Sequence, residues 1–521
     1  MPNFSFDKNS IKQEKVNVPN ALVPVINEIK TEPAPALLDF NTELSGIGPS
    51  CLSELKDLFS SIEECDAIKY QILVNKFGIN SRGEKFFSKL QASIEELWAP
   101  YDKRNPDRVI YKSGVVVLVF LFAKMCGAHT CMAVHDFWKA KNALLQLVIK
   151  DMPAPKYKIS AETLRVICSI PHPGTMEKLL KSWFSHLLIP PEKLLQNQHY
   201  DTHFQIFENN VWRYMRYRFT VGGDGQELHA TYLKGDPSKH KNYTCVSLFL
   251  CDARIAMDYM IVCQKNHECS AIIKMLKALN IDTQFIFCAD ALNNTASLRS
   301  CLKELEIDYI LPLKTNNGLG NLYDKVDKAF TEQSNLIVFT KPLVIKKHGR
   351  FEQYEINIIP AWQITKERDA GCFIQVKHCG FRYINGCPPR EIPAKCVKFR
   401  YYETSLGPNA VNYAQICHSI GIRWLYEEHH HMLDTVMMQD NHNMHNPGHI
   451  DFACGINKIV YNLMAFFRQP LSPCEGSPSR PISFWRVFAL CAGEPILAIW
   501  ALIKYLECAA MHAPVPVPET G

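Results

Sequence analysis

The stretch Phe285-Ile286-Phe287-Cys288-Ala289-Asp290 is a continuous apolar run that ends on a carboxylate. Such a run is typical of a strand buried on both faces of an α/β sheet. A carboxylate at the end of a buried strand is costly unless it is paired or bound to a metal. A second β-prone run carries an acid in a similar place, Asp224 within Val221-Gly222-Gly223-Asp224-Gly225, where the glycines let a ligand approach the backbone. Both segments therefore predict strands with a functional acid at or near the end.

A third acid comes from a helical segment, Arg423-Trp424-Leu425-Tyr426-Glu427. Three carboxylates delivered by separate elements match the needs of hard divalent cations, since Mg²⁺ and Mn²⁺ prefer anionic oxygen ligands. Two such ions can activate a nucleophile and stabilise the leaving oxygen of a phosphodiester. We therefore predict that Asp224, Asp290 and Glu427 are the catalytic residues and bind two Mg²⁺ or Mn²⁺ ions.

Each of these acids also has an ordinary structural interpretation. Asp224 could be a turn aspartate, and Asp290 could cap a helix over 292–302 while also binding metal. Glu427 lies one helical turn after Arg423, at the spacing of an i,i+4 ion pair. The adjacent Glu428 points elsewhere on the helix by about 100°. Glu427 is preferred as the third ligand because of its spacing from Arg423, and Glu428 remains the alternative.

The surrounding pattern predicts an α/β fold with several parts. Apolar positions at helical spacing mark residues 49–199 as a helical accessory domain, after a flexible arm over 1–48. Strands alternate with helices through a catalytic domain over 200–468, which contains a β-rich insertion at about 318–399. C-terminal helices and an extended tail occupy 469–521.

Composition sets the broad class of the protein. A net charge of +5 over 521 residues permits a nucleic-acid partner without requiring one. The 20 cysteines show no paired spacing typical of zinc sites, so we expect reduced and mostly buried thiols. The N-terminus lacks the apolar core of a signal peptide, and the apolar runs at 115–125 and 484–506 are expected to be buried helices rather than membrane anchors. We expect a cytoplasmic protein.

A series of short motifs, in order from about 98 to about 468, resembles a known family. They are Asp107-Arg108, Ser160-Ala161-Glu162-Thr163-Leu164-Arg165, Asp224-Gly225, Lys265-Asn266-His267-Glu268, Ala289-Asp290-Ala291-Leu292, Asp308 to Asn316, His348-Gly349-Arg350-Phe351-Glu352, Arg400-Tyr401-Tyr402, Ser405-Leu406, Arg423-Trp424 with Glu427, and Leu433-Asp434. Their order resembles bacterial insertion-sequence transposases of the DDE type, in the branch of the H-repeat-associated proteins.

The resemblance implies a ribonuclease-H-like catalytic core that holds two metal ions on Asp224, Asp290 and Glu427. It implies DNA as partner, both the terminal repeats of the protein's own element and target DNA, with a homo-oligomer in the DNA complex, a nucleoid-associated location in a bacterium and no membrane partner. Two alternatives stay open: a catalytically inactive, transposase-derived DNA-binding or regulatory protein, and a metal-dependent nuclease without strand transfer. The candidates for DNA contact are Lys314, Asn316, His348, Arg350, Arg423 and His431.

Two positions depart from the family pattern. The family commonly has Lys where Gln226 stands, and a basic residue where Asp434 stands. Both departures remove a cation from the neighbourhood of the predicted site. The histidine-rich stretch over 429–449 resembles a transition-metal cluster, but consecutive histidines on a helix point in different directions. We therefore expect these histidines to contact DNA phosphate or to lie at the surface, with zinc binding as the weaker alternative.

Overall fold

The computed structural model describes residues 81–154, 159–186, 203–208, 211–231, 243–263, 267–279, 284–314, 320–347, 350–366, 369–383, 390–391, 397–439, 446–467, 484–495 and 498. The predicted arm over 1–48 and the extended tail at the C-terminus lie outside these residues. The helices are α4 (Ser81–Trp98), α5 (Ser113–Met125), α6 (Cys131–Val148), α7 (Ala161–Cys168), α8 (Thr175–His186), α10 (Glu268–Ala278), α11 (Ala296–Glu304), α12 (Gly320–Glu332), α13 (Ala410–Ile422), α14 (Trp424–Thr435), α15 (Pro447–Phe467) and α16 (Phe484–Gly493).

The strands are β1 (His203–Glu208), β2 (Val211–Arg216), β3 (Phe219–Leu228), β4 (Tyr243–Leu250), β5 (Ile255–Val262), β6 (Phe285–Ala289), β7 (Asp308–Pro312), β8 (Phe339–Lys347), β9 (Arg350–Pro360), β10 (Cys372–Tyr383), β11 (Arg390–Glu391) and β12 (Phe399–Thr404). Short 3₁₀ helices occur at Pro106–Arg108, His229–Thr231, Ser334–Leu336 and Ala361–Gln363. The α/β class predicted from the sequence is confirmed as a mixed α/β fold with one large sheet.

That sheet has ten strands in the order β5-β4-β3-β6-β7-β12-β10-β9-β8, with β11 paired to β10. Strands β3, β4 and β5 form an antiparallel meander. The chain then returns through α10 and α11, and both β6 and β7 join the sheet in parallel. Each parallel pair thus has a helix in its connection, as the geometry of parallel strands requires.

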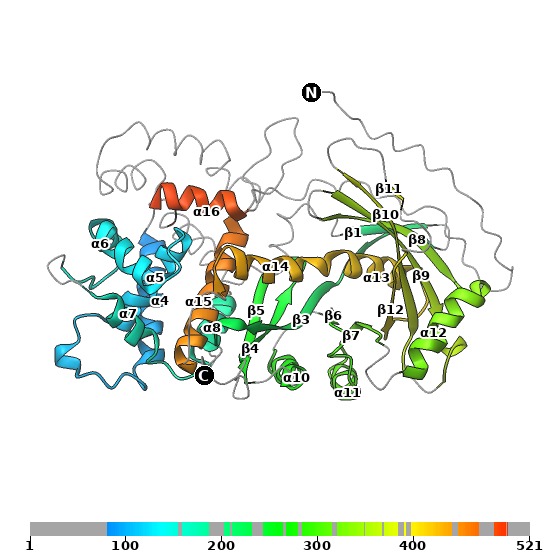
Figure 1. The fold of residues 1–521 in the computed structure, drawn as a ribbon, viewed down its shortest axis with the longest axis horizontal. Helices are drawn as coiled ribbons and strands as arrows, with labels where there is room; N and C mark the ends of the chain where they lie inside the picture. The colour runs from blue at the N-terminus through cyan, green and yellow to red at the C-terminus, as the bar shows by residue number, and fades with distance from the viewer. Residues whose placement is uncertain are drawn as a thin grey trace, which may run out of the picture.

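Strand β6 is buried on both faces, as its continuous apolar sequence predicts. Phe285, Phe287 and Ala289 pack in a core that includes residues of α10 and α11. Ile286 and Cys288, which alternate with them, pack in a second core with residues of α13. Figure 1 shows α10 and α11 below the central strands, with α13 and α14 running across on the other side. The two layers of helices exclude water from both sides of the strand that precedes Asp290.

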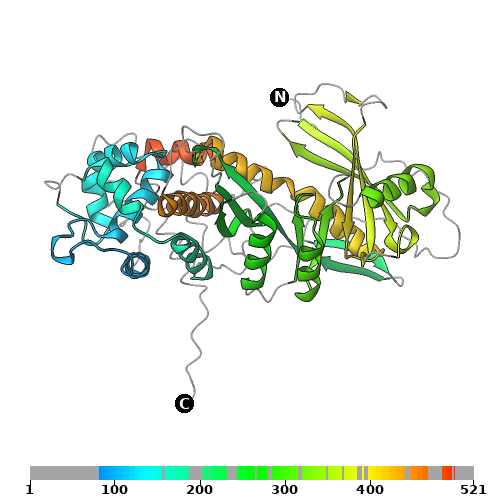
Figure 2. The same ribbon diagram turned by 60° about the horizontal axis from the view of Figure 1, so that its bottom comes forward.

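The β-rich segment continues the central sheet rather than standing apart from it. Strand β12 pairs antiparallel with β7, through Tyr402 and Pro312 among others, and β10, β9 and β8 extend the sheet further. In Figure 2 these strands and α12 form one end of an elongated molecule, with α4 to α7 at the opposite end. Alternating residues over 336–344 and 351–359 predict a hairpin with its turn at 347–350. The antiparallel pairing of β8 with β9 confirms the hairpin, and residues 348 and 349 of the turn lie outside the described residues.

The N-terminal helices share a hydrophobic core with the edge of the sheet. Helix α5 is buried along its whole length and packs in one cluster with Cys245 of β4, Tyr259 of β5 and much of α15. The run that raised the question of a membrane span is thus the central helix of this core. None of the helices among the described residues is long and apolar enough to cross a bilayer.

The sequence also predicts Ser113 as a helix N-cap and Ser160 with Thr163 as the start of another helix. Ser160 caps α7, its hydroxyl accepting a hydrogen bond from Thr163 N at 3.0 Å. Ser113 is not a cap, since the helix begins at Ser113 and Lys112 is the N-cap residue. Most of the described cysteines are buried, and all of them are free thiols. These cysteine findings match the reduced, mostly buried thiols that the sequence predicts.

Candidate active site

Strand pairing brings Asp224 and Asp290 side by side. Strands β3 and β6 are parallel, and Gly223 lies opposite Ala289 in their register. The next residue in each segment is an aspartate, so the two acids lie on neighbouring segments of the sheet, whose strands are about 4.8 Å apart. Asp290 directly follows β6, but Asp224 lies in the middle of β3, so the expectation of an acid at or near the end of its strand is wrong for Asp224. The two aspartates are 66 positions apart in the chain. They meet because the connection through α10 returns the chain to the sheet with β6 parallel to β3.

The alternation of side chains along β3 sets the direction of Asp224. A Cβ added at Gly222 would lie 2.9 Å from the ring of Tyr426, so this face of the strand looks toward α14. Asp224 follows two residues later and shares that face. The Tyr426 hydroxyl donates hydrogen bonds to Asp224 O at 2.9 Å and to Ser247 O at 3.2 Å. Helix α14 is therefore fixed directly over the strand that carries Asp224.

The surroundings of Asp224 oppose its ionisation. Burial, together with the negative charge of Asp290, raises the pKa of Asp224 to about 7. Glu268, in the first turn of α10, adds a smaller repulsion. Glu268 is 3% exposed, and its carboxyl group occupies the space where a side chain at residue 225 would lie. Glu268 belongs to a motif noted in the sequence, but only its position over Gly225 shows that it borders the site.

Asp290 does not cap the following helix. Its Oδ1 accepts hydrogen bonds from Asn293 N at 3.0 Å and Asn293 Nδ2 at 2.8 Å, within the turn after β6. Helix α11 begins only at Ala296 and is capped by Thr295. The interpretation of Asp290 as a helix cap is therefore wrong. One oxygen of this carboxylate is held by the turn, which fixes the side chain at the end of the sheet.

Glu427 and Glu428 leave α14 in different directions. Glu428 pairs with Arg254, Oε2 to Nη1, at 3.0 Å. Glu427 lies 3.8 Å from Arg423, Oε1 to Nη2, and its side chain is 51% exposed. Arg423 in turn interacts electrostatically with Asp224. Glu427 thus lies on the side of the helix that carries Arg423, while Glu428 pairs with Arg254; the choice between them as metal ligand stays a prediction.

Arg423 is the cation at the centre of this group, with a side chain 24% exposed. Burial lowers the pKa of its guanidinium, but acidic neighbours outweigh burial and leave the pKa raised. Those neighbours are Tyr402, Cys288, Glu427 and Asp224. The sequence from Ala410 to Met438 predicts one helical segment. Arg423 interrupts it, because α13 ends before this residue and α14 begins after it. The break places a cation between two of the predicted metal ligands.

Among the described residues, no three His, Cys, Asp or Glu side chains lie close enough together to hold a metal ion. The donor chemistry nevertheless fits a hard cation, because Asp224 and Asp290 supply neighbouring carboxylates whose repulsion raises the pKa of Asp224. The predicted binding of Mg²⁺ or Mn²⁺ by Asp224, Asp290 and Glu427 stays a prediction.

The two positions that depart from the family pattern contact each other. The side-chain amide of Gln226 donates a hydrogen bond to Asp434, across 208 positions of sequence. The oxygen of Gln226 accepts from Gln439 Nε2 at 3.0 Å. An amide and a carboxylate are thus hydrogen-bonded at the two positions where the transposases that the sequence resembles have cations. This pairing could not be read from either residue alone.

The consecutive histidines of α14 diverge, as helix geometry predicts. His429 is fully buried, stacked on Phe249 with ring centroids 4.6 Å apart. Burial lowers its pKa well below the usual value, and burial also lowers the pKa of His430 to about 3. Both rings are therefore neutral, and the expectation that these histidines lie at the surface is wrong for His429. His431 is exposed, which leaves its predicted DNA contact open.

The remaining predicted DNA contacts have different outcomes. Lys314 is exposed, and together with Asp290 it lines a cavity that is described below. Asn316 and His348 lie outside the described residues. Arg350 is the first residue of β9, at the end of the hairpin where β8 and β9 join. The structure therefore brings Lys314 and Arg423 together near Asp290. The roles of all these residues in DNA binding stay predictions.

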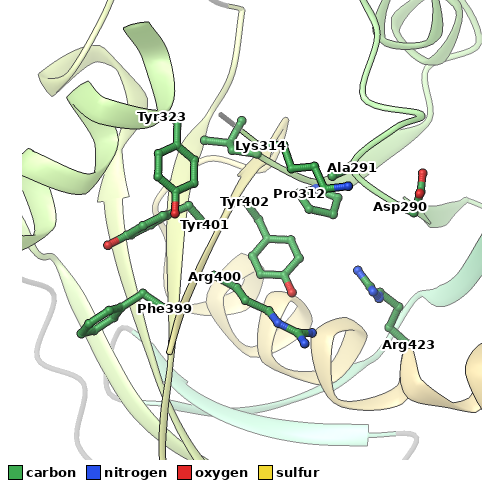
Figure 3. Close-up of a pocket in the computed structure, with 11 residues that line it drawn as sticks. Asp290, Ala291, Pro312, Lys314, Tyr323, Phe399, Arg400, Tyr401, Tyr402 and Arg423 are labelled. Atoms are coloured by element: carbon green, nitrogen blue, oxygen red, sulfur yellow. The ribbon is translucent and has the colours of Figure 1, made fainter. Parts of the chain in front are cut away.

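A cavity of about 360 Å³ opens next to Asp290, and we name it the aromatic cavity. Its lining residues are Asp290, Ala291, Pro312, Leu313, Lys314, Tyr323, Phe399, Arg400, Tyr401, Tyr402 and Arg423. In Figure 3 the charged ends of Lys314 and Arg423 lie on the side of Asp290, while the rings of Tyr323, Tyr401 and Phe399 lie on the other side. The motif Arg400-Tyr401-Tyr402 was part of the family resemblance, but its place beside Asp290 depends on the pairing of β12 with β7.

Comparisons with known proteins find little. No protein-family model matches the chain, and no curated protein matches it. Among solved structures, the chain is similar to piggyBac transposase in a synaptic complex with hairpin DNA, determined by cryo-electron microscopy. The TM-score is 0.36 at 11% identity, over 84% of this chain and 86% of that chain. A likeness of this strength assigns no activity to the present protein.

Proposed function

We propose that the protein is a DDE-type transposase, which cleaves and joins DNA at the ends of a mobile element by metal-dependent phosphodiester chemistry. The observation that carries this proposal is the meeting of Asp224 and Asp290 where the parallel pairing of β3 with β6 ends, on the side of helix α14. Helix α14 supplies the third acid, Glu427, near Arg423. In this proposal the three acids come from three separate elements, β3, the turn after β6 and α14.

The strand order supports the same proposal. An antiparallel meander of β3, β4 and β5 followed by parallel β6 and β7 is compatible with the ribonuclease-H-like core that the family resemblance implies. Helices on both faces of β6 shield the strand from water, so Asp290 is the first residue beyond the buried strand. The proposal includes the assignment to the H-repeat-associated branch of the bacterial insertion-sequence transposases.

The residues would share the work as follows. Asp224, Asp290 and Glu427 would hold two divalent cations, which supply activation of the nucleophile and stabilisation of the leaving oxygen when bound. Arg423 balances the charge of Asp224 and Glu427 before the metals bind. Lys314 holds a DNA phosphate beside Asp290, because its exposed ammonium group lines the same cavity. The hydrogen bonds from Asn293 hold Asp290 in place.

The test is cleavage of DNA that spans the borders of the gene, with purified full-length protein and Mg²⁺. Replacing Asp224, Asp290 or Glu427 with Ala should abolish cleavage, while binding of the same DNA stays within about twofold, because affinity comes from phosphate contacts spread over the molecule. Glu428→Ala is the matched control and should cleave at the wild-type rate. Each variant is also checked for an unchanged thermal unfolding midpoint or a raised one.

Two outcomes would contradict the assignment. Cleavage by Asp290→Ala at near the wild-type rate would show that the reaction does not use this site. An inactive Glu428→Ala beside an active Glu427→Ala would move the third ligand to Glu428.

A second candidate function rests on the contact between Gln226 and Asp434. These residues replace cations of the family pattern with a neutral amide and an acid that satisfy each other. A protein of this kind could retain DNA binding after losing catalysis. Binding of border DNA by the wild type, with no cleavage at any Mg²⁺ or Mn²⁺ concentration, would favour this candidate.

A further inference from the structure

The aromatic cavity has two chemically different sides. The side next to Asp290 carries Lys314, Arg400 and Arg423, so three cations face a single lining acid. The other side carries aromatic rings, of which Phe399 is 40% exposed. Cations bind phosphate oxygens, and an exposed ring stacks on a nucleobase. The cavity thus offers both parts of a nucleotide a matching surface.

Its size selects one nucleotide rather than a duplex. A volume of about 360 Å³ lies at the lower end of the range typical of small-molecule sites, roughly 300–1,000 Å³. Stacked base pairs cannot enter a cavity of this size, so a base must leave the duplex to reach it. The floor of the cavity is rigid, because Tyr401 is 2% exposed and stacks on Phe330 with ring centroids 5.8 Å apart.

The side chains that would contact the nucleotide are held by their neighbours. Arg400 lies over the ring of Trp424 at 5.5 Å, which fixes the start of α14 against β12. Tyr401 is bonded through its hydroxyl to Asp327 and to Gln375. Phe399 has no such anchor among the interactions of the described residues and keeps its ring available at the rim.

We propose that the aromatic cavity holds a single unstacked nucleotide of the DNA strand processed at Asp224 and Asp290, with its phosphate near Lys314 and Arg423 and its base against Phe399. This inference rests on the proposed function, because it places the nucleotide next to the acids that would act on the strand. The cavity then sets which base can occupy the position beside the cut. The cavity then recognises the base by its shape and by stacking, rather than by hydrogen bonds to base edges in the major groove.

The experiment uses full-length protein in EDTA and a short duplex with one unpaired 2-aminopurine, compared with the same duplex fully paired. Stacking on an aromatic side chain quenches this base, so binding of the bulged duplex should lower its emission. Phe399→Ala should remove the quenching and weaken binding of the bulged duplex by roughly tenfold, the effect of losing one stacked base. Its affinity for the paired duplex should not change.

Two variants serve as controls. Phe399→Trp should keep both quenching and affinity, because it retains an aromatic face. Trp362→Ala removes another exposed aromatic ring, 59% exposed in the wild type and outside the cavity lining, and should have no effect. Arg400→Gln should weaken binding of the bulged duplex. It should also lower the slope of log affinity against log salt concentration by about one unit.

Several results would overturn the proposal. They are an unchanged signal in Phe399→Ala, an equal loss of affinity for paired and bulged duplexes, and displacement of the bulged duplex by free deoxynucleoside monophosphate at lower concentration than by DNA. Cleavage assays separate this proposal from the proposed function. Quenching that depends on Phe399 without any cleavage leaves the cavity assignment standing and removes the enzymatic one; cleavage that depends on Asp290 without quenching does the reverse.

Discussion

Asp224 is the residue whose environment departs most clearly from that of an ordinary surface acid. It lies beside Asp290 on the neighbouring strand and close to Glu268, and Arg423 only partly compensates these charges. Because burial penalises the charged form, the acid keeps its proton to higher pH in the folded protein than in the unfolded chain. Folding therefore has to hold a repulsive group of acids together when no metal is bound.

This repulsion makes a prediction for Asp224→Asn. The pKa of Asp224 rises from 3.8 to about 7 on folding, so the wild-type protein loses stability as the pH rises through this range. In EDTA at pH 8, the Asn variant should be more stable by about 1–3 kcal/mol, the full shift being reduced by partial exposure. The gain should vanish below about pH 4. Denaturant unfolding across pH measures it, and a gain independent of pH would contradict the assigned cause.

The packing of Glu268 against Gly225 explains why a glycine follows Asp224. A Cβ at this position would lie 2.4 Å from both Cδ and Oε1 of Glu268. Gly225→Ala should therefore displace a buried carboxylate and destabilise the protein by about 1–3 kcal/mol. Glu268→Ala removes the clashing atoms, so the double variant should be more stable than the sum of the two single changes predicts. Additive effects in urea unfolding would show that Glu268 does not limit residue 225.

At the scale of elements, the β-rich segment has two roles that the sequence did not separate. Strand β12 completes the central sheet and lines the aromatic cavity, whereas the β8–β9 hairpin forms the outer edge of the sheet. The hairpin carries Lys346, Lys347 and Arg350 at the end where β8 and β9 join, and β7, β12 and β10 separate its strands from β6 in the sheet. Any contact that they make with DNA is thus separable from the chemistry.

Neutralising these three cations tests the contact. The triple variant Lys346→Gln, Lys347→Gln, Arg350→Gln should weaken DNA binding and flatten the dependence of affinity on salt, by about one unit of slope for each lost phosphate contact. Replacing Lys277 and Lys303, on α10 and α11, by Gln is the control for nonspecific loss of charge. A salt slope equal to that of the wild type would show that the hairpin does not touch DNA.

At the scale of the molecule, a chain of polar side chains links the helical region to the site. Lys124 Nζ of α5 donates to Asn457 Oδ1 at 2.8 Å, and Asn457 donates to Gln439 at 3.3 Å. Gln439 then donates to Gln226, which bonds Asp434. This chain runs through the shared hydrophobic core and reaches Gln226, two residues from Asp224. It connects elements that the sequence assigns to different domains.

The buried end of this chain gives a pH dependence. Burial lowers the pKa of Lys124 from 10.5 to about 8, so the unfolded chain binds a proton that the folded protein lacks between these values. Stability from this group therefore rises with pH over that range, by at most about 3 kcal/mol. Lys124→Met should lose this rise, and the exposed Lys139→Met should retain it. Urea unfolding from pH 7 to 10 measures the difference, and parallel curves for wild type and Lys124→Met would refute it.

The sequence by itself determined the local features of this protein. The apolar run before Asp290 specified a strand buried on both faces, and the stretch from Arg423 to Glu427 specified a helical segment that carries Glu427. The cap at Ser160 and the divergence of the consecutive histidines also follow from local geometry. Such features depend on neighbouring residues and on the fixed periods of helix and strand, so they can be predicted without knowledge of the rest of the chain.

Only the tertiary structure decided which distant groups meet. The contact of Gln226 with Asp434, the burial of His429 and the place of Glu268 over Gly225 depend on how α14 and α10 pack on β3. The place of Phe399 in the same cavity as Asp290 depends on the pairing of β12 with β7. Periodicity shows that a face is buried but not what covers it, because many partners bury the same apolar area. Packing and strand register choose among those partners, and they alone brought the two aspartates to one edge of the sheet.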